Sequence, residues 1–180
     1  RSALYPMSLL LATIVLRSWT QLGMITFIPF YYISHLKGDP LLAGNLLFAF
    51  LTAGTVGTFL GGPLADRVGH KKVLLFSLGA SCPLFVLFLL SSGFWAFFWL
   101  MLAGLILIFS FSVSMVMGQS FMPHNVGMAS GLILGLSFGM GGLGTAILGL
   151  FADLWGVPTT LWIITFLPWA SVPFAVFIPY

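Results

Sequence analysis

Two long apolar runs of this 180-residue chain are separated by the segment Gly62-Pro63-Leu64-Ala65-Asp66-Arg67-Val68-Gly69-His70-Lys71-Lys72. The segment holds four of the nine charged residues of the chain, together with two glycines and a proline that favour a turn. Because charges and turn-forming residues gather here, we predict a short polar connection between two apolar helices. The rest of the chain is organised around this connection and a second copy of its central pattern.

The chain outside this segment is strongly apolar. Hydrophobic residues make up 60% of the sequence and charged residues only 5%, whereas a soluble domain carries about 25% charged residues. This composition excludes a water-soluble enzyme, a nucleic-acid-binding protein and a disulfide-rich secreted domain, and the single cysteine, Cys82, can form no internal disulfide. The lipid bilayer is therefore the first expected partner.

Six apolar stretches have the length of a membrane-spanning helix, which needs about 20 residues to cross the bilayer core. The strands of a membrane β-barrel would instead show alternating segments of about ten residues. We therefore predict an all-α polytopic membrane protein with six transmembrane helices. The predicted spans are Leu4–Ile33, Leu42–Pro63, Val73–Leu90, Phe94–Met117, Gly127–Phe151 and Val157–Ile178.

The basic residues predict the orientation of these spans, because short cytoplasmic loops are enriched in Lys and Arg. One side of the membrane would carry Arg1, Arg67, Lys71 and Lys72, and the other side only Lys37. We expect both termini and the Gly62–Lys72 segment to be cytoplasmic.

The sequence also contains an internal repeat. A shift of 87 positions superimposes residues 44–69 on residues 131–156, and both segments end in the pattern G-x-x-A-D-x-x-G, at Gly62–Gly69 and Gly149–Gly156. The two copies are three spans apart, so they cross the membrane in opposite directions. We predict an inverted 3+3 repeat, with repeats of about residues 1–90 and 91–180, as is typical of transporters.

The Gly62–Lys72 segment resembles the signature loop of the major facilitator superfamily, G-x-L-a-D-r-x-G-r-k, with His70 where a basic residue is usual. Two further stretches, from Arg17 to Pro29 and from Gly127 to Gly144, are similar to the carboxy-terminal half of the fosmidomycin-resistance-like drug exporters of that superfamily. The resemblance covers nearly the whole chain and implies spans seven to twelve of a twelve-helix transporter.

This resemblance implies secondary active efflux of a small molecule or drug across a bacterial inner membrane, with antibiotic resistance as one outcome. It implies alternating access driven by proton antiport, without a cofactor. Six residues would form the conformational-switch loop: Gly62, Asp66, Arg67, Gly69, Lys71 and Lys72. Within this loop, Asp66 could cap the N-terminus of a neighbouring helix, whose dipole favours an anion.

Arg17 is the first candidate for substrate binding, because it lies near the middle of the first span. A charge at that depth costs about 2.5–3.5 kcal/mol on insertion scales. Thr13, Thr20 and Gln21 lie on the same helical face at spacings of three and four residues. We hypothesise that this face binds an anionic or polar substrate in a central cavity; the alternative is that Arg17 snorkels or forms a structural pair.

Other residues are weaker candidates. Tyr31, just past Pro29, could contact the substrate and gate the outer end, or could belong to an aromatic belt. Ser114 shares a face of the fourth span with Ser110 and could line the cavity. The ridge of Gly131, Gly135 and Gly139 predicts close helix packing or a hinge, with Asp153 at the end of the same span.

The acidic residues bear on energy coupling. The chain has no Glu, and Asp39, Asp66 and Asp153 all lie outside the predicted spans. If the transporter is proton-driven, the titrating carboxylate is expected in an amino-terminal six-helix half. The chain would then work with that half or with a second copy of itself, and the missing initiator Met favours a fragment.

The sequence leaves two alternatives to a transporter. A structural six-helix scaffold would explain the glycines but not the charge of Arg17. An intramembrane serine hydrolase is disfavoured, because Ser130 and His35 are predicted on opposite sides of the membrane and His124 lies in a loop. His, Asp and Glu are not clustered as metal ligands would be, so we expect neither an enzyme nor a metal site.

Overall fold

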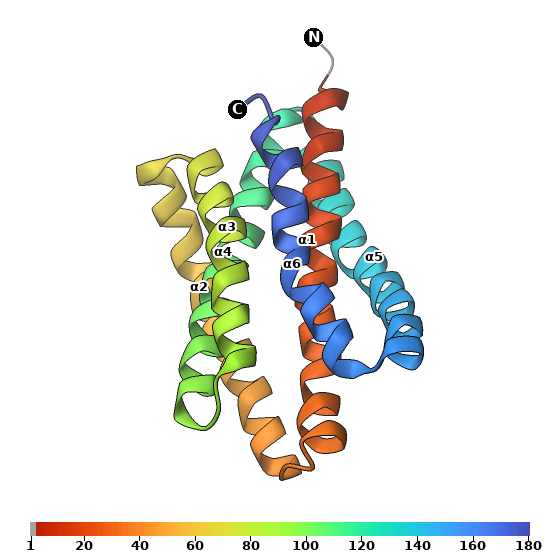
Figure 1. Ribbon diagram of the computed structural model, residues 1–180. Helices are drawn as coiled ribbons and strands as arrows, with labels where there is room; N and C mark the ends of the chain where they lie inside the picture. The colour runs from red at the N-terminus through yellow and green to blue at the C-terminus, as the bar shows by residue number, and fades with distance from the viewer. Residues whose placement is uncertain (1–2) are drawn as a thin grey trace.

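The computed structural model describes residues 3–180 as six long helices with short connections, and it contains no strand within that range (Figure 1). All six helices are long and apolar enough to cross a membrane, which confirms the predicted all-α architecture. Arg1 lies outside the described residues. The helices are α1 (Leu4–Phe30), continued by a π-helical turn η1 (Tyr31–His35), then α2 (Pro40–Val68), α3 (His70–Leu90), α4 (Phe94–Phe121), α5 (Val126–Trp155) and α6 (Val157–Val176).

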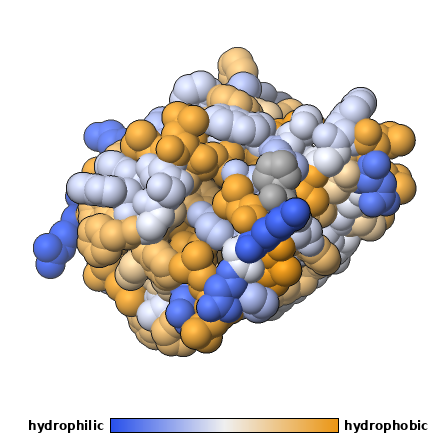
Figure 2. Space-filling view, turned by 60° about the horizontal axis from the view of Figure 1, so that its bottom comes forward, coloured by the Kyte–Doolittle hydropathy of each residue, from blue (hydrophilic) through white to orange (hydrophobic). Residues whose placement is uncertain are grey.

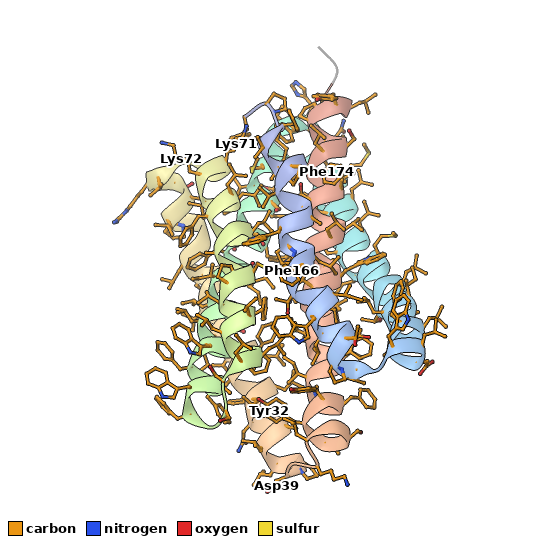
Figure 3. The ribbon with its side chains drawn as sticks, in the orientation of Figure 1. Tyr32, Asp39, Lys71, Lys72, Phe166 and Phe174 are labelled. Atoms are coloured by element: carbon orange, nitrogen blue, oxygen red, sulfur yellow. The ribbon has the colours of Figure 1, made fainter. Side chains whose placement is uncertain are left out.

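Apart from Arg17, the charged residues of the described chain lie at the two ends of the bundle. The start of α1, the end of α6 and the α2–α3 connection lie at one end, where Lys71 and Lys72 are found, and Asp39 lies at the opposite end (Figures 1 and 3). On the face drawn in Figure 2, which brings the end of the bundle near Asp39 forward, strongly hydrophilic residues occupy small patches among hydrophobic and weakly hydrophilic ones. Large hydrophobic side chains are exposed along all six helices, as is expected of a bundle whose sides face lipid.

The ends of α2 and α5 differ from the prediction. Both helices run through the repeated Ala-Asp pair, so Asp66 and Asp153 lie in the last helical turn and not in loops. Each helix ends at a single glycine with positive φ, +112° at Gly69 and +90° at Gly156. Glycine adopts this backbone conformation without the steric cost that a Cβ brings. The prediction placed the breaks too early because it treated the charged residues, and not the glycines, as the boundary.

Corresponding helices of the two repeats pack in corresponding ways. α2 packs against α4, while α5 runs in the opposite direction and packs against α1 (Figure 1). Glycines related by the 87-residue shift lie against residues that are themselves related by a shift of 86. The contacts are Gly54 with Ile108 and Gly57 with Leu105 in one interface, and Gly141 with Leu22 and Gly144 with Trp19 in the other. The inverted repeat is therefore visible in the packing as well as in the sequence.

The predicted ridge on α5 lies elsewhere than in these interfaces. A Cβ added at Gly131, Gly135 or Gly139 would meet nothing within 4 Å, and all three glycines are exposed. Within the described chain, the ridge packs against no other helix. The glycines that allow close approach are those one or two turns further along α5, together with their counterparts on α2.

One helix contact follows directly from a proline. Pro83 has no N–H group, so the carbonyl of Gly79, four residues earlier in α3, loses its helical donor. The indole Nε1 of Trp169 on α6 donates to this carbonyl at 2.9 Å. In a membrane an unpaired backbone carbonyl is costly, so this bond stabilises the packing of α6 on α3.

We expect Trp169→Phe to lower the stability of the full-length protein by about 1 kcal/mol, since interhelical hydrogen bonds in membranes are worth roughly that amount. Thermal unfolding in detergent, followed by circular dichroism, would measure the change. Trp162→Phe on the same helix is the matched control, because the Trp162 indole donates no hydrogen bond to any described residue. Equal stability of the two variants would show that the Gly79 carbonyl needs no partner.

Candidate functional site

A cavity of about 260 Å³ lies near the middle of the bundle, between α1, α2, α4 and α5. Each helix contributes residues from close to its midpoint, so the cavity is at the depth of the bilayer centre. The lining residues are Arg17, Ser18, Gln21, Leu22, Leu51, Gly54, Thr55, Thr58, Ile108, Phe111, Ser137 and Phe138. Five of these residues carry apolar side chains and six carry polar ones, and the polar ones come mainly from α1 and α2.

Arg17 is the only charged residue that lines this cavity. Its side chain is 3% exposed, and its guanidinium carbon lies 5.4 Å from the ring centroid of Phe111. Neither Nε nor Nη1 has a hydrogen-bond partner among the described residues. Burying a charged group in a membrane costs free energy unless an opposite charge or hydrogen-bond acceptors stabilise it. Arg17 thus neither snorkels to a helix end nor forms an ion pair within the described part of the chain.

The polar face of α1 is rotated from the predicted one. The cavity receives Arg17, Ser18 and Gln21, which are neighbours on a helix of 3.6 residues per turn. Thr13 and Thr20 are buried on the adjoining face, where their hydroxyls donate to Leu9 and Leu16 of the same helix at 3.0 and 3.2 Å. Of the predicted α1 residues, the structure therefore brings Arg17 and Gln21 to the cavity and leaves the threonines outside it.

Two further predicted residues also lie outside the cavity lining. Tyr31 is in η1, where its ring packs edge-on against that of Tyr32 with centroids 5.6 Å apart. Ser114 is buried on α4, one turn beyond Phe111, and its hydroxyl has no hydrogen-bond partner among the described residues. Contact of either residue with a substrate stays a prediction.

Ser137 on α5 is a cavity residue that the sequence analysis missed. Its side chain is 4% exposed, and its hydroxyl has no partner within the described residues. Its backbone carbonyl accepts a hydrogen bond of 2.6 Å from the hydroxyl of Ser18 on α1. The sequence did contain an indication of this residue, because Ser137 is a hydroxyl residue near the middle of a span that is otherwise glycine-rich and apolar.

The Gly62–Lys72 segment makes side-chain contacts at one end of the bundle. The Oδ1 atom of Asp66 lies 3.3 Å from Nε2 of His70 in the first turn of α3. Asp66 caps no described helix, since the N-cap of α3 is Gly69 and carries no side-chain bond. Lys71 donates from Nζ to the carbonyl of Ile178 at 2.7 Å, which ties the start of α3 to the carboxy-terminal segment.

Ser130, the serine of the hydrolase alternative, accepts a hydrogen bond of 2.9 Å from the side-chain amide of Gln119. This bond links the end of α4 to the start of α5. Within the described residues, no histidine bonds to Ser130.

Comparison with known proteins identifies the family. The sequence profile described as Major Facilitator Superfamily matches residues 9–179, a range that includes every residue lining the cavity. The chain belongs to the Major Facilitator Superfamily. A solved member of the superfamily shares the fold. The chain superimposes on FucP in its outward conformation with a TM-score of 0.80 and 18% identity, over 97% of this chain and 42% of FucP.

Two curated superfamily members are similar in sequence. The uncharacterized MFS-type transporter YfnC of Bacillus subtilis is 45% identical over 126 residues, which are 70% of this chain and 31% of YfnC. The fosmidomycin resistance protein of Escherichia coli is 41% identical over 122 residues, 68% of this chain and 30% of that protein. The matched part of the chain thus spans about a third of the length of these relatives.

Proposed function

We propose that this chain is one half of a secondary active transporter that exports a small molecule by alternating access. The observation that carries the proposal is the buried guanidinium of Arg17, which lines a cavity at mid-membrane depth and whose Nε and Nη1 atoms have no hydrogen-bond partner among the described residues. Membership of the superfamily and the similarity to a fosmidomycin resistance protein favour export of a drug-like compound.

The cavity lies where a substrate site of such a transporter would be expected. Four helices, two from each predicted repeat, surround it, and the substrate sites of transporters built from inverted repeats lie near the bilayer midplane where the repeats meet. The cavity combines six polar residues with leucine, isoleucine and phenylalanine side chains, and small-molecule sites commonly place polar groups within an apolar lining. A purely structural scaffold has no use for an uncompensated charge at this position.

Proton antiport requires a titrating group, and we place it outside this chain. None of the three aspartates lies at mid-span: Asp39 precedes α2, while Asp66 and Asp153 are in the last turns of α2 and α5. The carboxylate that couples export to the proton gradient would then belong to an amino-terminal six-helix half.

The proposal is tested by transport into inside-out membrane vesicles that contain the full-length protein. We expect uptake of radiolabelled fosmidomycin when respiration makes the vesicle interior acidic, and loss of at least about nine-tenths of that uptake when a protonophore collapses the gradient, because a coupled antiporter has no other energy source. Vesicles without the protein give the background. Uptake that persists after the protonophore would exclude proton coupling, and uptake equal to background would exclude export of this compound.

A further inference from the structure

We infer that the cavity binds an oxyanion, such as a phosphate, phosphonate or carboxylate group, between the guanidinium of Arg17 on α1 and the hydroxyl of Ser137 on α5. The inference rests on the proposed transport function and names the class of substrate. It is carried by two buried donors that line the same cavity and lack partners within the described residues.

The donor set selects the ligand. A guanidinium is planar, holds only donors and stays charged, so its best partner is a planar or tetrahedral oxyanion that accepts two parallel hydrogen bonds. The Phe111 ring lies 5.4 Å from the guanidinium carbon, a position typical of a cation–π contact. Such a contact pairs the charge with the ring but gives the N–H groups no acceptor oxygen, and Nε and Nη1 have no other hydrogen-bond partner among the described residues.

Ser137 adds a donor of a different kind from the neighbouring helix. Its carbonyl already accepts a hydrogen bond from the hydroxyl of Ser18. The residue as a whole is 4% exposed, and its own hydroxyl has no hydrogen-bond partner among the described residues. A buried hydroxyl without a partner costs free energy. An oxyanion in the cavity would accept from it and from Arg17 together, and would thereby connect α1 to α5.

The other cavity hydroxyls are less suited to donate to a ligand. Thr55 and Thr58 already donate to the carbonyls of Leu51 and Gly54 within α2, at 3.0 and 3.2 Å. Their oxygens can still accept, which suits hydroxyl or amide groups on the remainder of a substrate. The anion-binding end of the cavity is therefore on the α1–α5 side.

The test is calorimetric titration of the purified full-length protein with propylphosphonate, butyrate and uncharged 1-butanol. We expect both anions to bind and 1-butanol not to bind. Ser137→Ala should weaken anion binding about tenfold, because a hydrogen bond to a charged group is worth roughly that factor. Arg17→Gln should weaken anion binding by about 100-fold. Arg17→Lys should weaken it by an intermediate factor, because lysine keeps the positive charge but lacks the paired, coplanar N–H donors of a guanidinium.

Ser81→Ala is the matched control, since Ser81 is equally buried but donates to Leu78 of its own helix and lies outside the cavity. Equal affinity of Ser137→Ala and Ser81→Ala would remove Ser137 from the site. Failure of both anions to bind the wild type would overturn the inference, including the case in which a carboxylate from the rest of the transporter neutralises Arg17. Export of an uncharged compound by the same protein would then leave the transport function standing and only the ligand class rejected.

Discussion

Arg17→Gln is expected to lower the rate of export by the full-length protein at least about 30-fold, which corresponds to roughly 2 kcal/mol. The reason is geometric: among the described residues, Arg17 is the only charged residue that lines the mid-membrane cavity, and its Nε and Nη1 atoms have no hydrogen-bond partner there. Glutamine fills a similar volume and keeps a hydrogen-bonding group but removes the charge. The measurement is the initial rate of export, divided by the amount of transporter in the membrane.

The same variant separates function from folding. Removing a charge from mid-span relieves an insertion cost of about 2.5–3.5 kcal/mol, so Arg17→Gln should insert at least as well as the wild type. A structural role would predict the reverse, with less folded protein and an unchanged rate per molecule. A normally inserted Arg17→Gln protein that exports at the wild-type rate would contradict the role we assign to Arg17.

Gly57→Ala is expected to destabilise the full-length protein by about 3 kcal/mol, at the upper end of the cost of overpacking. A Cβ at this position would overlap the backbone carbonyl of Leu105 on α4, and a backbone atom cannot turn aside as a side chain can. Helix propensity alone predicts the opposite, since alanine favours a helix over glycine by about 1 kcal/mol. The sign of the change in unfolding free energy, measured in detergent, therefore decides between the two effects.

Two other glycine-to-alanine variants serve as comparisons for Gly57→Ala. Gly79→Ala adds a Cβ that meets nothing within 4 Å, so its stability should equal or exceed that of the wild type. Gly144→Ala adds a Cβ that lies 2.5 Å from the ring of Trp19, and the ring can shift, so the loss should be smaller than at Gly57. Equal stability of Gly57→Ala and Gly79→Ala would show that α2 and α4 are not held at the described separation.

The helices were predictable because lipid imposes length and hydropathy on each span, and the repeated Ala-Asp pattern correctly paired α2 with α5. Helix ends were harder, because a charge signals a membrane boundary while the backbone ends the helix at a glycine. Asp66 and Asp153 were misplaced for that reason. A row of glycines likewise shows that another helix can approach closely, but it does not show which helix does so. The exposed ridge of Gly131, Gly135 and Gly139 on α5 therefore could not be distinguished from the glycines that pack against other helices.

The candidate site was predictable only in part. Arg17 could be found from sequence because a mid-span charge is rare, and Gln21 followed from helical spacing. The exclusion of Thr13 and Thr20 depends on how far α1 is rotated about its axis, which the packing of α5 and α6 decides. Ser137 could be recognised as a cavity residue only from the tertiary structure, because a single serine in an apolar span more often donates its hydrogen bond to a carbonyl of its own helix.

We expect the transported molecule to occupy the Arg17 cavity. Protection of a cysteine introduced at Thr55, which lines the cavity and bonds only within α2, tests this expectation. In a background without other reactive thiols, we expect the exported compound to slow maleimide labelling of Thr55→Cys at concentrations that saturate export, and to leave labelling of Lys37→Cys in the α1–α2 connection unchanged. Labelling of both positions at the same rate with and without the compound would contradict this expectation.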